Sequence, residues 1–109
     1  NTDLEIDILQ PESFVLQQNY PNPFNATTTI HFGVPSQSDV NVAIYNILGQ
    51  EVTRYEFKAL MPAYYDIHWQ GLNKFHQLVS SGVYFYVIQT RETDSGARHI
   101  ESKKMVLVK

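Results

Sequence analysis

The chain has 109 residues, of which 43% are hydrophobic and 13% aromatic, enough for the core of one domain. A net charge of −3 argues against a nucleic-acid partner, which requires a clustered basic surface, and no apolar run is long enough to span a bilayer. The absence of cysteine rules out a disulfide framework.

Charge is unevenly distributed along the chain. Residues 1–12 carry four carboxylates and no Lys or Arg, whereas residues 98–109 carry four cations and one carboxylate. We expect residues 1–13 to be a linker or the tail of a preceding domain, with room for one short strand, and residues 14–109 to form the folded domain. The charge reversal fits either ordinary solvated faces or an acidic linker followed by a basic recognition edge.

Residues 18–30 (QNYPNPFNATTTI) predict a stiff turn that leads into a strand. Pro21 and Pro23 fix their own φ angles and push the preceding residues into extended conformations. Asn22 and Asn25 can close local turns with their side chains, and the three threonines that follow favour a strand. The anchors expected to hold this turn against the domain are Tyr20 and Phe24.

Period-two alternation of apolar residues predicts strands over 30–34 and 40–44, and the turn residues 35–39 fit a hairpin between them. Residues 46–49 form the next turn, in which Gly49 is free to adopt a positive φ. Further strands are expected over 51–57 and 64–69.

Residues 71–81 lack a clear period and predict a loop. Residues 83–90 are almost continuously apolar, which predicts a central strand covered on both faces. A polar hairpin loop over 91–98 precedes a last strand over 99–108. About seven strands and no helix predict an all-β, antiparallel sandwich of immunoglobulin-like type.

Few residues suggest chemistry, so we expect no enzyme, no cofactor and no metal site. No serine lies in a nucleophile elbow, and the carboxylates fall mostly at turns. His31 and His68 alternate with core residues and are expected to point outward. Two weaker possibilities stay open, namely a calcium ion bound in the loop of Glu92 and Asp94 and a glycosylation sequon at Asn25.

The aromatic residues raise a second possibility, a sugar-stacking platform of a carbohydrate-binding sandwich. However, Trp69 continues the alternation of Tyr65 and Ile67, which predicts that it is buried between the sheets. Tyr84 or Tyr86 fits a tyrosine corner, with a buried ring and a hydroxyl that binds the backbone. The aromatic residue expected to be most exposed is Tyr64.

Five sequence blocks in order resemble a known family, the type A C-terminal sorting domain of the bacterial type IX (Por) secretion system. The resemblance covers residues 14–109, and its blocks read QNYPNPFN-x-TTTI, IYNILGQEV, WQG, SGVYFY and KKMVLVK. The matching residues named as motif or structural positions are Pro21, Asn22, Pro23, Phe24, Asn25, Gly49, Trp69, Gly82 and Tyr84. The sequence departs from the family pattern at Ala26, Tyr64 and Gln70.

The resemblance implies an immunoglobulin-like fold and a secretion signal that directs an amino-terminal cargo domain across the outer membrane. It implies partners in the type IX translocon and sortase, passage through the periplasm to the cell surface or medium, and a cleavage site within residues 1–13. For recognition it points to the terminal strand, with Lys103, Lys104 and Lys109. The alternative is a fibronectin-III-like or carbohydrate-binding accessory module of a secreted enzyme.

Overall fold

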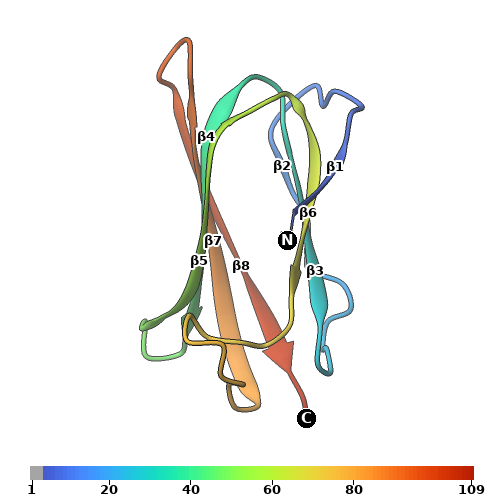
Figure 1. Cartoon of the computed structure of the whole chain (residues 1–109), viewed down its shortest axis with the longest axis vertical. Helices are drawn as coiled ribbons and strands as arrows, with labels where there is room; N and C mark the ends of the chain where they lie inside the picture. The colour runs from blue at the N-terminus through green and yellow to red at the C-terminus, as the bar shows by residue number, and fades with distance from the viewer. Residues whose placement is uncertain (1–3) are drawn as a thin grey trace.

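Eight strands form two facing four-stranded sheets in the computed structural model, which describes residues 4–109 (Figure 1). The first sheet has the order β1–β6–β3–β2 and contains β1 (Leu4–Asp7), β2 (Val15–Leu16), β3 (Thr28–Val34) and β6 (Ala63–Trp69). The second has the order β5–β4–β7–β8 and contains β4 (Ser38–Asn46), β5 (Glu51–Leu60), β7 (Gly82–Glu92) and β8 (Arg98–Leu107). All of these strand pairs are antiparallel, so the predicted all-β sandwich is confirmed.

The core lies between the sheets because each strand turns alternate residues inward. Tyr65, Ile67 and Trp69 of β6 are at most 2% exposed, as their alternation predicted. On the outer face of the same sheet, His31 binds Asp66 at 2.6 Å and His68 binds Glu5 at 2.9 Å. The prediction that both histidines point outward is therefore confirmed.

Two predictions about how strands are connected and covered were wrong. Residues 35–37 do not close a hairpin, because β3 and β4 belong to different sheets and the turn carries the chain across the core. The hydrophobic alternation of a hairpin and of a crossing between sheets is the same, so the pattern did not separate them. Strand β7 is central but not covered on both faces, since Phe85 is 39% exposed on the outer side of a two-layer fold.

The segment predicted as a linker contains β1, which fits the short strand that the sequence allowed there. Residues 1–3 of that segment lie outside the described part of the chain. Among the described strands β1 pairs with β6 alone, at the edge of its sheet, and Glu5, Ile6 and Asp7 are exposed. Within residues 4–109 no helix is long and apolar enough to cross a membrane.

Candidate functional site at the motif end of the sandwich

Most of the sequence blocks that carry the family resemblance meet at one end of the sandwich. We call this the motif end and define it by residues 17–27, 46–50, 70–81 and 108–109, which lie together at the bottom of Figure 1. Residues 35–37, 61–62 and 93–97 form turns at the opposite end. Blocks far apart in the sequence therefore meet at one end of the sandwich.

Three motif aromatics form the buried base of this surface. The ring centroid of Trp69 lies 5.6 Å from that of Phe24 and 5.6 Å from that of Tyr84. Phe24 and Trp69 are each 1% exposed, and Tyr84 is 5% exposed. Each ring comes from a different block, so the cluster joins the PNPF turn, the WQG segment and the SGVYFY strand through their largest side chains.

The PNPF turn is fastened to the outer edge of β8. Phe24 N–H donates to Val106 O at 2.9 Å, and Val108 N–H donates to Phe24 O at 2.8 Å. The Asn22 side chain accepts from Val106 N–H at 3.0 Å, so it binds a distant strand rather than closing the local turn that the sequence predicted. Both Tyr20–Pro21 and Asn22–Pro23 are cis peptide bonds.

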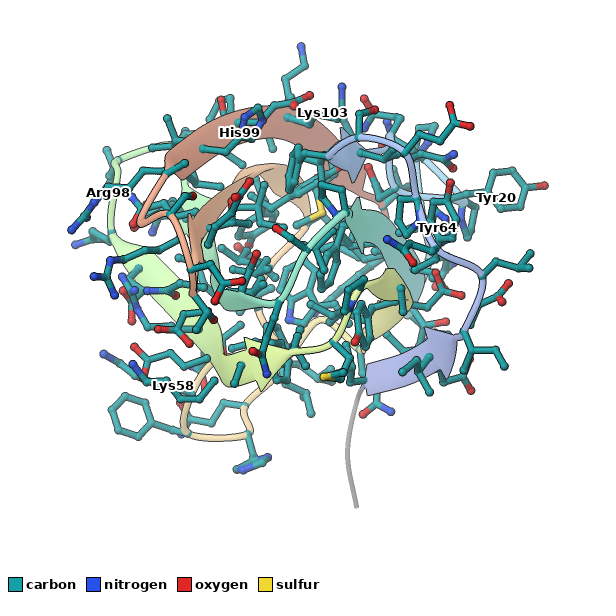
Figure 2. The ribbon with its side chains drawn as sticks, turned by 90° about the horizontal axis from the view of Figure 1, so that it is seen from above. Tyr20, Lys58, Tyr64, Arg98, His99 and Lys103 are labelled. Carbon is teal, nitrogen blue, oxygen red and sulfur yellow. The ribbon has the colours of Figure 1, made fainter. Side chains whose placement is uncertain are left out.

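The two predicted anchors of this turn behave differently. Phe24 is buried as expected, whereas Tyr20 is 80% exposed and projects from the side of the molecule (Figure 2). Tyr64, the aromatic residue expected to be most exposed, is instead half-buried and stacks on His31 with ring centroids 5.4 Å apart. Asn25 contributes its carbonyl, which accepts from Thr27 N–H at 3.0 Å.

A second fastening point, next to the turn, is the hydroxyl of Tyr86. It donates to Gln17 O at 2.8 Å and accepts from Asn19 N–H at 2.8 Å. The buried Asn19 side chain donates in turn to Thr28 Oγ1 at 2.9 Å. Burial raises the pKa of Tyr86 to about 12, against a smaller lowering by the Asn19 N–H. Sequence reasoning found Tyr86 and missed Asn19, whose importance depends on a residue 67 positions away.

Two aromatics of the buried cluster, Trp69 and Tyr84, form hydrogen bonds with the backbone of the loop over residues 70–81. Trp69 Nε1 donates to Leu72 O at 2.9 Å, and the Tyr84 hydroxyl donates to Ser80 O at 2.7 Å. Lys74 N–H donates to Val52 O at 2.9 Å, which ties the loop to the start of β5. The tyrosine-corner prediction is thus confirmed for both tyrosines, since each buries its ring and binds backbone with its hydroxyl.

The β4–β5 turn is ordered by Asn46, whose Oδ1 accepts from Leu48 N–H at 2.9 Å and from Gln50 N–H at 3.0 Å. Gly49 has a φ of 79°, the left-handed conformation that the sequence predicted. Gly82 opens β7 at a φ of 153°, with no heavy atom near the position of a Cβ. Both glycines thus serve the backbone path.

The motif end carries four large apolar side chains that are exposed. Ile47 and Leu48 at the β4–β5 turn are 70% and 77% exposed, and Phe75 and Leu78 of the loop are 71% and 70% exposed. Between the loop, the PNPF turn and the end of the chain lies a cavity of about 210 Å³, lined by Asn25, Ala26, Gln70, Gly71, Leu78, Leu107 and Lys109. Such a rim is typical of protein contact surfaces.

The three candidate recognition lysines are not brought together. Lys103 lies 3.6 Å from Glu101 and is partly buried, and Lys104 projects from the opposite face of the strand. Lys109 lines the cavity, and its N–H donates to Ser81 Oγ at 3.1 Å. Only Lys109 therefore belongs to the motif end.

Strand β8 lies at a sheet edge, yet the half that carries these lysines already has partners. Besides the bonds of Asn22 and Phe24, Lys104 O accepts from Gln18 Nε2 at 2.7 Å. The PNPF turn thus covers the backbone edge from Lys104 to Val108. A partner strand cannot add there without displacing this turn.

Among residues 4–109 no three His, Asp or Glu side chains gather in a manner that could hold a metal ion. Glu51, at the start of β5, is held by Arg54 with Nη2–Oε1 at 2.7 Å, and this hydrogen bond lowers the pKa of its carboxyl. Trp69, Tyr65, Tyr84 and Tyr86 are all buried, so they do not form a sugar-stacking face.

Comparison with known proteins supports the resemblance to a sorting domain that the sequence blocks indicated. A family model described as "Secretion system C-terminal sorting domain" matches residues 18–101, and the match stops short of Lys103, Lys104 and Lys109. No curated protein sequence matches the chain.

Among solved structures, dimeric latent PorU from Porphyromonas gingivalis is 22% identical with a TM-score of 0.66, over 87% of this chain and 9% of that chain. PorZ, a surface component of the type IX secretion system of the same organism, is 18% identical with a TM-score of 0.49, over 84% and 11%. FLGD from P. aeruginosa is 17% identical with a TM-score of 0.60, over 85% and 71%.

The likenesses to PorU and FLGD show the fold alone, and the chain spans only about a tenth of the PorU and PorZ chains. The family model, in contrast, covers well over half of this chain, from the turn that is fastened to β8 into β8 itself. The chain therefore belongs to the secretion-system C-terminal sorting domains, which are secretion signals of the type IX system, engage its machinery and accompany proteins to the cell surface or beyond.

Proposed function

We propose that this domain is recognised in its folded state, and that type IX translocon and sortase components contact its motif end. The observation that carries the proposal is the convergence of distant sequence blocks on one surface, built on the Phe24–Trp69–Tyr84 cluster and rimmed by exposed apolar residues. The domain itself performs no reaction and binds no nucleic acid. Residues 14–109 constitute the signal.

The cargo is an amino-terminal domain of the same precursor, which passes through the periplasm and across the outer membrane. We place the cleavage site for surface attachment within residues 1–13. Exposed residues 8–10 offer a sortase more accessible backbone than β1, whose residues are paired with β6. We include Lys109 at the motif end, together with Lys103 and Lys104 farther along β8, as the cations of the recognition surface.

A reporter-export assay tests this function. The domain is fused behind a periplasm-directed reporter in a host that carries a type IX system, and reporter in the medium and on the cell surface is measured. The Lys103→Gln, Lys104→Gln, Lys109→Gln triple variant should stay within about 1 kcal/mol of the parent in stability, because partly exposed ion pairs contribute little. It should nevertheless lose export.

The matched control is Lys58→Gln, which removes a lysine whose side chain is 87% exposed near the end of β5, next to the turn over residues 61–62. Its export should equal that of the parent. Normal export of the triple variant would remove the lysines from the signal. A parallel variant with Ile47→Ser and Leu48→Ser would then locate recognition on the apolar rim of the motif end. Retention of the isolated domain on cellulose or chitin would instead favour a carbohydrate-binding module.

A further inference from the structure

The backbone edge of β8 is open over its first half. Val106 directs both its N–H and its C=O away from β7, toward the PNPF turn. In an antiparallel strand every second residue is oriented alike, so Ser102 and Ile100 also direct their N–H and C=O groups outward. No group within residues 4–109 binds these outward groups, and both side chains are exposed.

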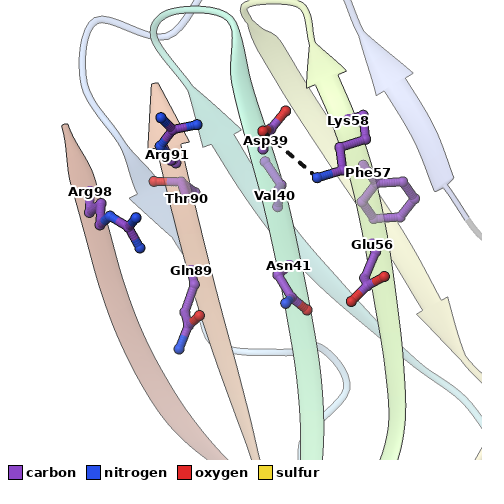
Figure 3. A pocket seen from close by; sticks show the side chains of 10 residues that line it. All are labelled: Asp39, Val40, Asn41, Glu56, Phe57, Lys58, Gln89, Thr90, Arg91 and Arg98. Carbon is purple, nitrogen blue, oxygen red and sulfur yellow. Dashed lines mark ion pairs between the residues drawn. The ribbon is translucent and has the colours of Figure 1, made fainter. Parts of the chain in front are cut away.

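Two arginines lie next to this open edge, one on β8 and one on the neighbouring β7, on the outer face of the sheet. Arg91 and Arg98 are directly opposite each other on β7 and β8, beside a cavity of about 370 Å³ (Figure 3). Within the described residues neither guanidinium has an ion pair or a side-chain hydrogen bond.

The carboxylate nearest in register, Asp39, is directed to another strand. It stands opposite Arg91 but accepts from Ala59 N–H at 2.9 Å and lies 4.0 Å from Lys58. Like charges directly opposite each other destabilise a sheet, and a bound anion relieves that cost. Since the chain as a whole is negatively charged, this local cationic pair is not an extension of a general basic surface.

We propose that the open half of β8 and the Arg91–Arg98 pair bind an extended acidic segment of a partner protein by strand addition. Ile100 and Ser102 supply the backbone hydrogen bonds, as in other sheets that accept a peptide strand. Side chains of an added strand alternate with period two, so a carboxylate two positions from the residue opposite Ile100 lies across from Arg98. There it accepts charge-assisted bonds from the guanidinium.

A second copy of the chain fits this edge less well. Antiparallel pairing of two β8 edges about Ile100 places Arg98 of each copy beside Ser102 of the other, without a carboxylate. The carboxylate of Glu101 is already shared by Lys103 at 3.6 Å and His99 at 3.5 Å. The proposal is independent of the sorting function, because the site lies beyond the motif end and uses none of the recognition lysines.

The test uses the 109-residue chain and two labelled octapeptides, one with alternating threonine and glutamate and one with alternating threonine and lysine. Fluorescence anisotropy at low salt should detect binding of the glutamate peptide alone. Arg91→Gln with Arg98→Gln should weaken it by about tenfold or more. The matched control is Lys104→Gln, an exposed cation on the same strand whose carbonyl is already bonded to Gln18, and it should change affinity by less than about twofold.

Ser102→Pro tests the backbone contribution, because it deletes one outward donor while every ladder bond to β7 remains. It should weaken glutamate-peptide binding by about tenfold, whereas Ser102→Ala should not change it. If the proline variant does not fold, peptide-induced slowing of amide exchange at Ile100 and Ser102 of the parent decides the question. Equal binding of both peptides, protection confined to another strand edge, or a concentration-dependent dimer that protects these amides would each overturn the proposal.

Discussion

Replacement of Phe24 by alanine should destabilise this domain more than any substitution of its neighbour Tyr20. Phe24 is 1% exposed, packs on Trp69 at 5.6 Å and supports the turn whose backbone is bonded to β8. Emptying a buried phenylalanine site costs about 3–5 kcal/mol. Since one kcal/mol shifts the Tm of a domain of this size by about 4–8 °C, a decrease of at least 12 °C is expected.

Tyr20→Ala is the matched control, because it removes an aromatic ring of similar size from the same turn. Tyr20 is 80% exposed, and surface substitutions usually stay within about 0.5 kcal/mol. Unfolding in urea can be followed by fluorescence of Trp69, the single tryptophan, which touches Phe24.

Amide exchange of Val106 and Val108 reports separately on the turn, since both N–H groups donate to it. In Phe24→Ala these two amides should exchange faster relative to the central amides of β7. A loss below about 1 kcal/mol for Phe24→Ala, or an equal loss for Tyr20→Ala, would refute the conclusion that the buried ring fastens the turn.

Two further predictions concern the same framework. Trp69→Ala should destabilise by about 3–5 kcal/mol and Trp69→Phe by less, and an unchanged urea midpoint for Trp69→Ala would contradict its place between the sheets. For Tyr86, a folded pKa of about 12 against an ordinary value near 10 means that its contribution is present below about pH 10 and is lost as the pH rises toward 12, a decrease of about 3 kcal/mol. Urea titrations between pH 9 and 12 should show this decrease in the parent and a shallower one in Tyr86→Phe, and equal slopes would argue against the buried hydroxyl.

Local patterns in the sequence were sufficient to predict the strands and to predict which face of most strands points into the core. The alternation of Tyr65, Ile67 and Trp69 has one solution that buries the largest rings, and the structure has that solution. The turn at Gly49 follows from a residue that adopts a positive φ without strain. The family blocks likewise identified the PNPF turn and the Gly49 turn, which both lie at the motif end.

Other features depended on partners that a local pattern does not contain. Asn22 was predicted to close its own turn, but in the folded chain its side chain accepts from Val106 N–H, 84 residues away. Phe24 and Tyr20 are both aromatic residues of one turn, and the sequence did not show that Phe24 alone of the two packs on Trp69 and is buried.

The sequence by itself determined that the chain is a sandwich with a stiff turn at its start and a basic strand at its end. The tertiary structure decided which backbone groups at the edges remain free, because edge pairing depends on which segments the two sheets bring together. Thus the PNPF turn covers the lysine-bearing half of β8, whereas the half that begins at Arg98 stays open. Hydrogen-bond satisfaction is a property of the assembled fold, so no local pattern could distinguish the two halves.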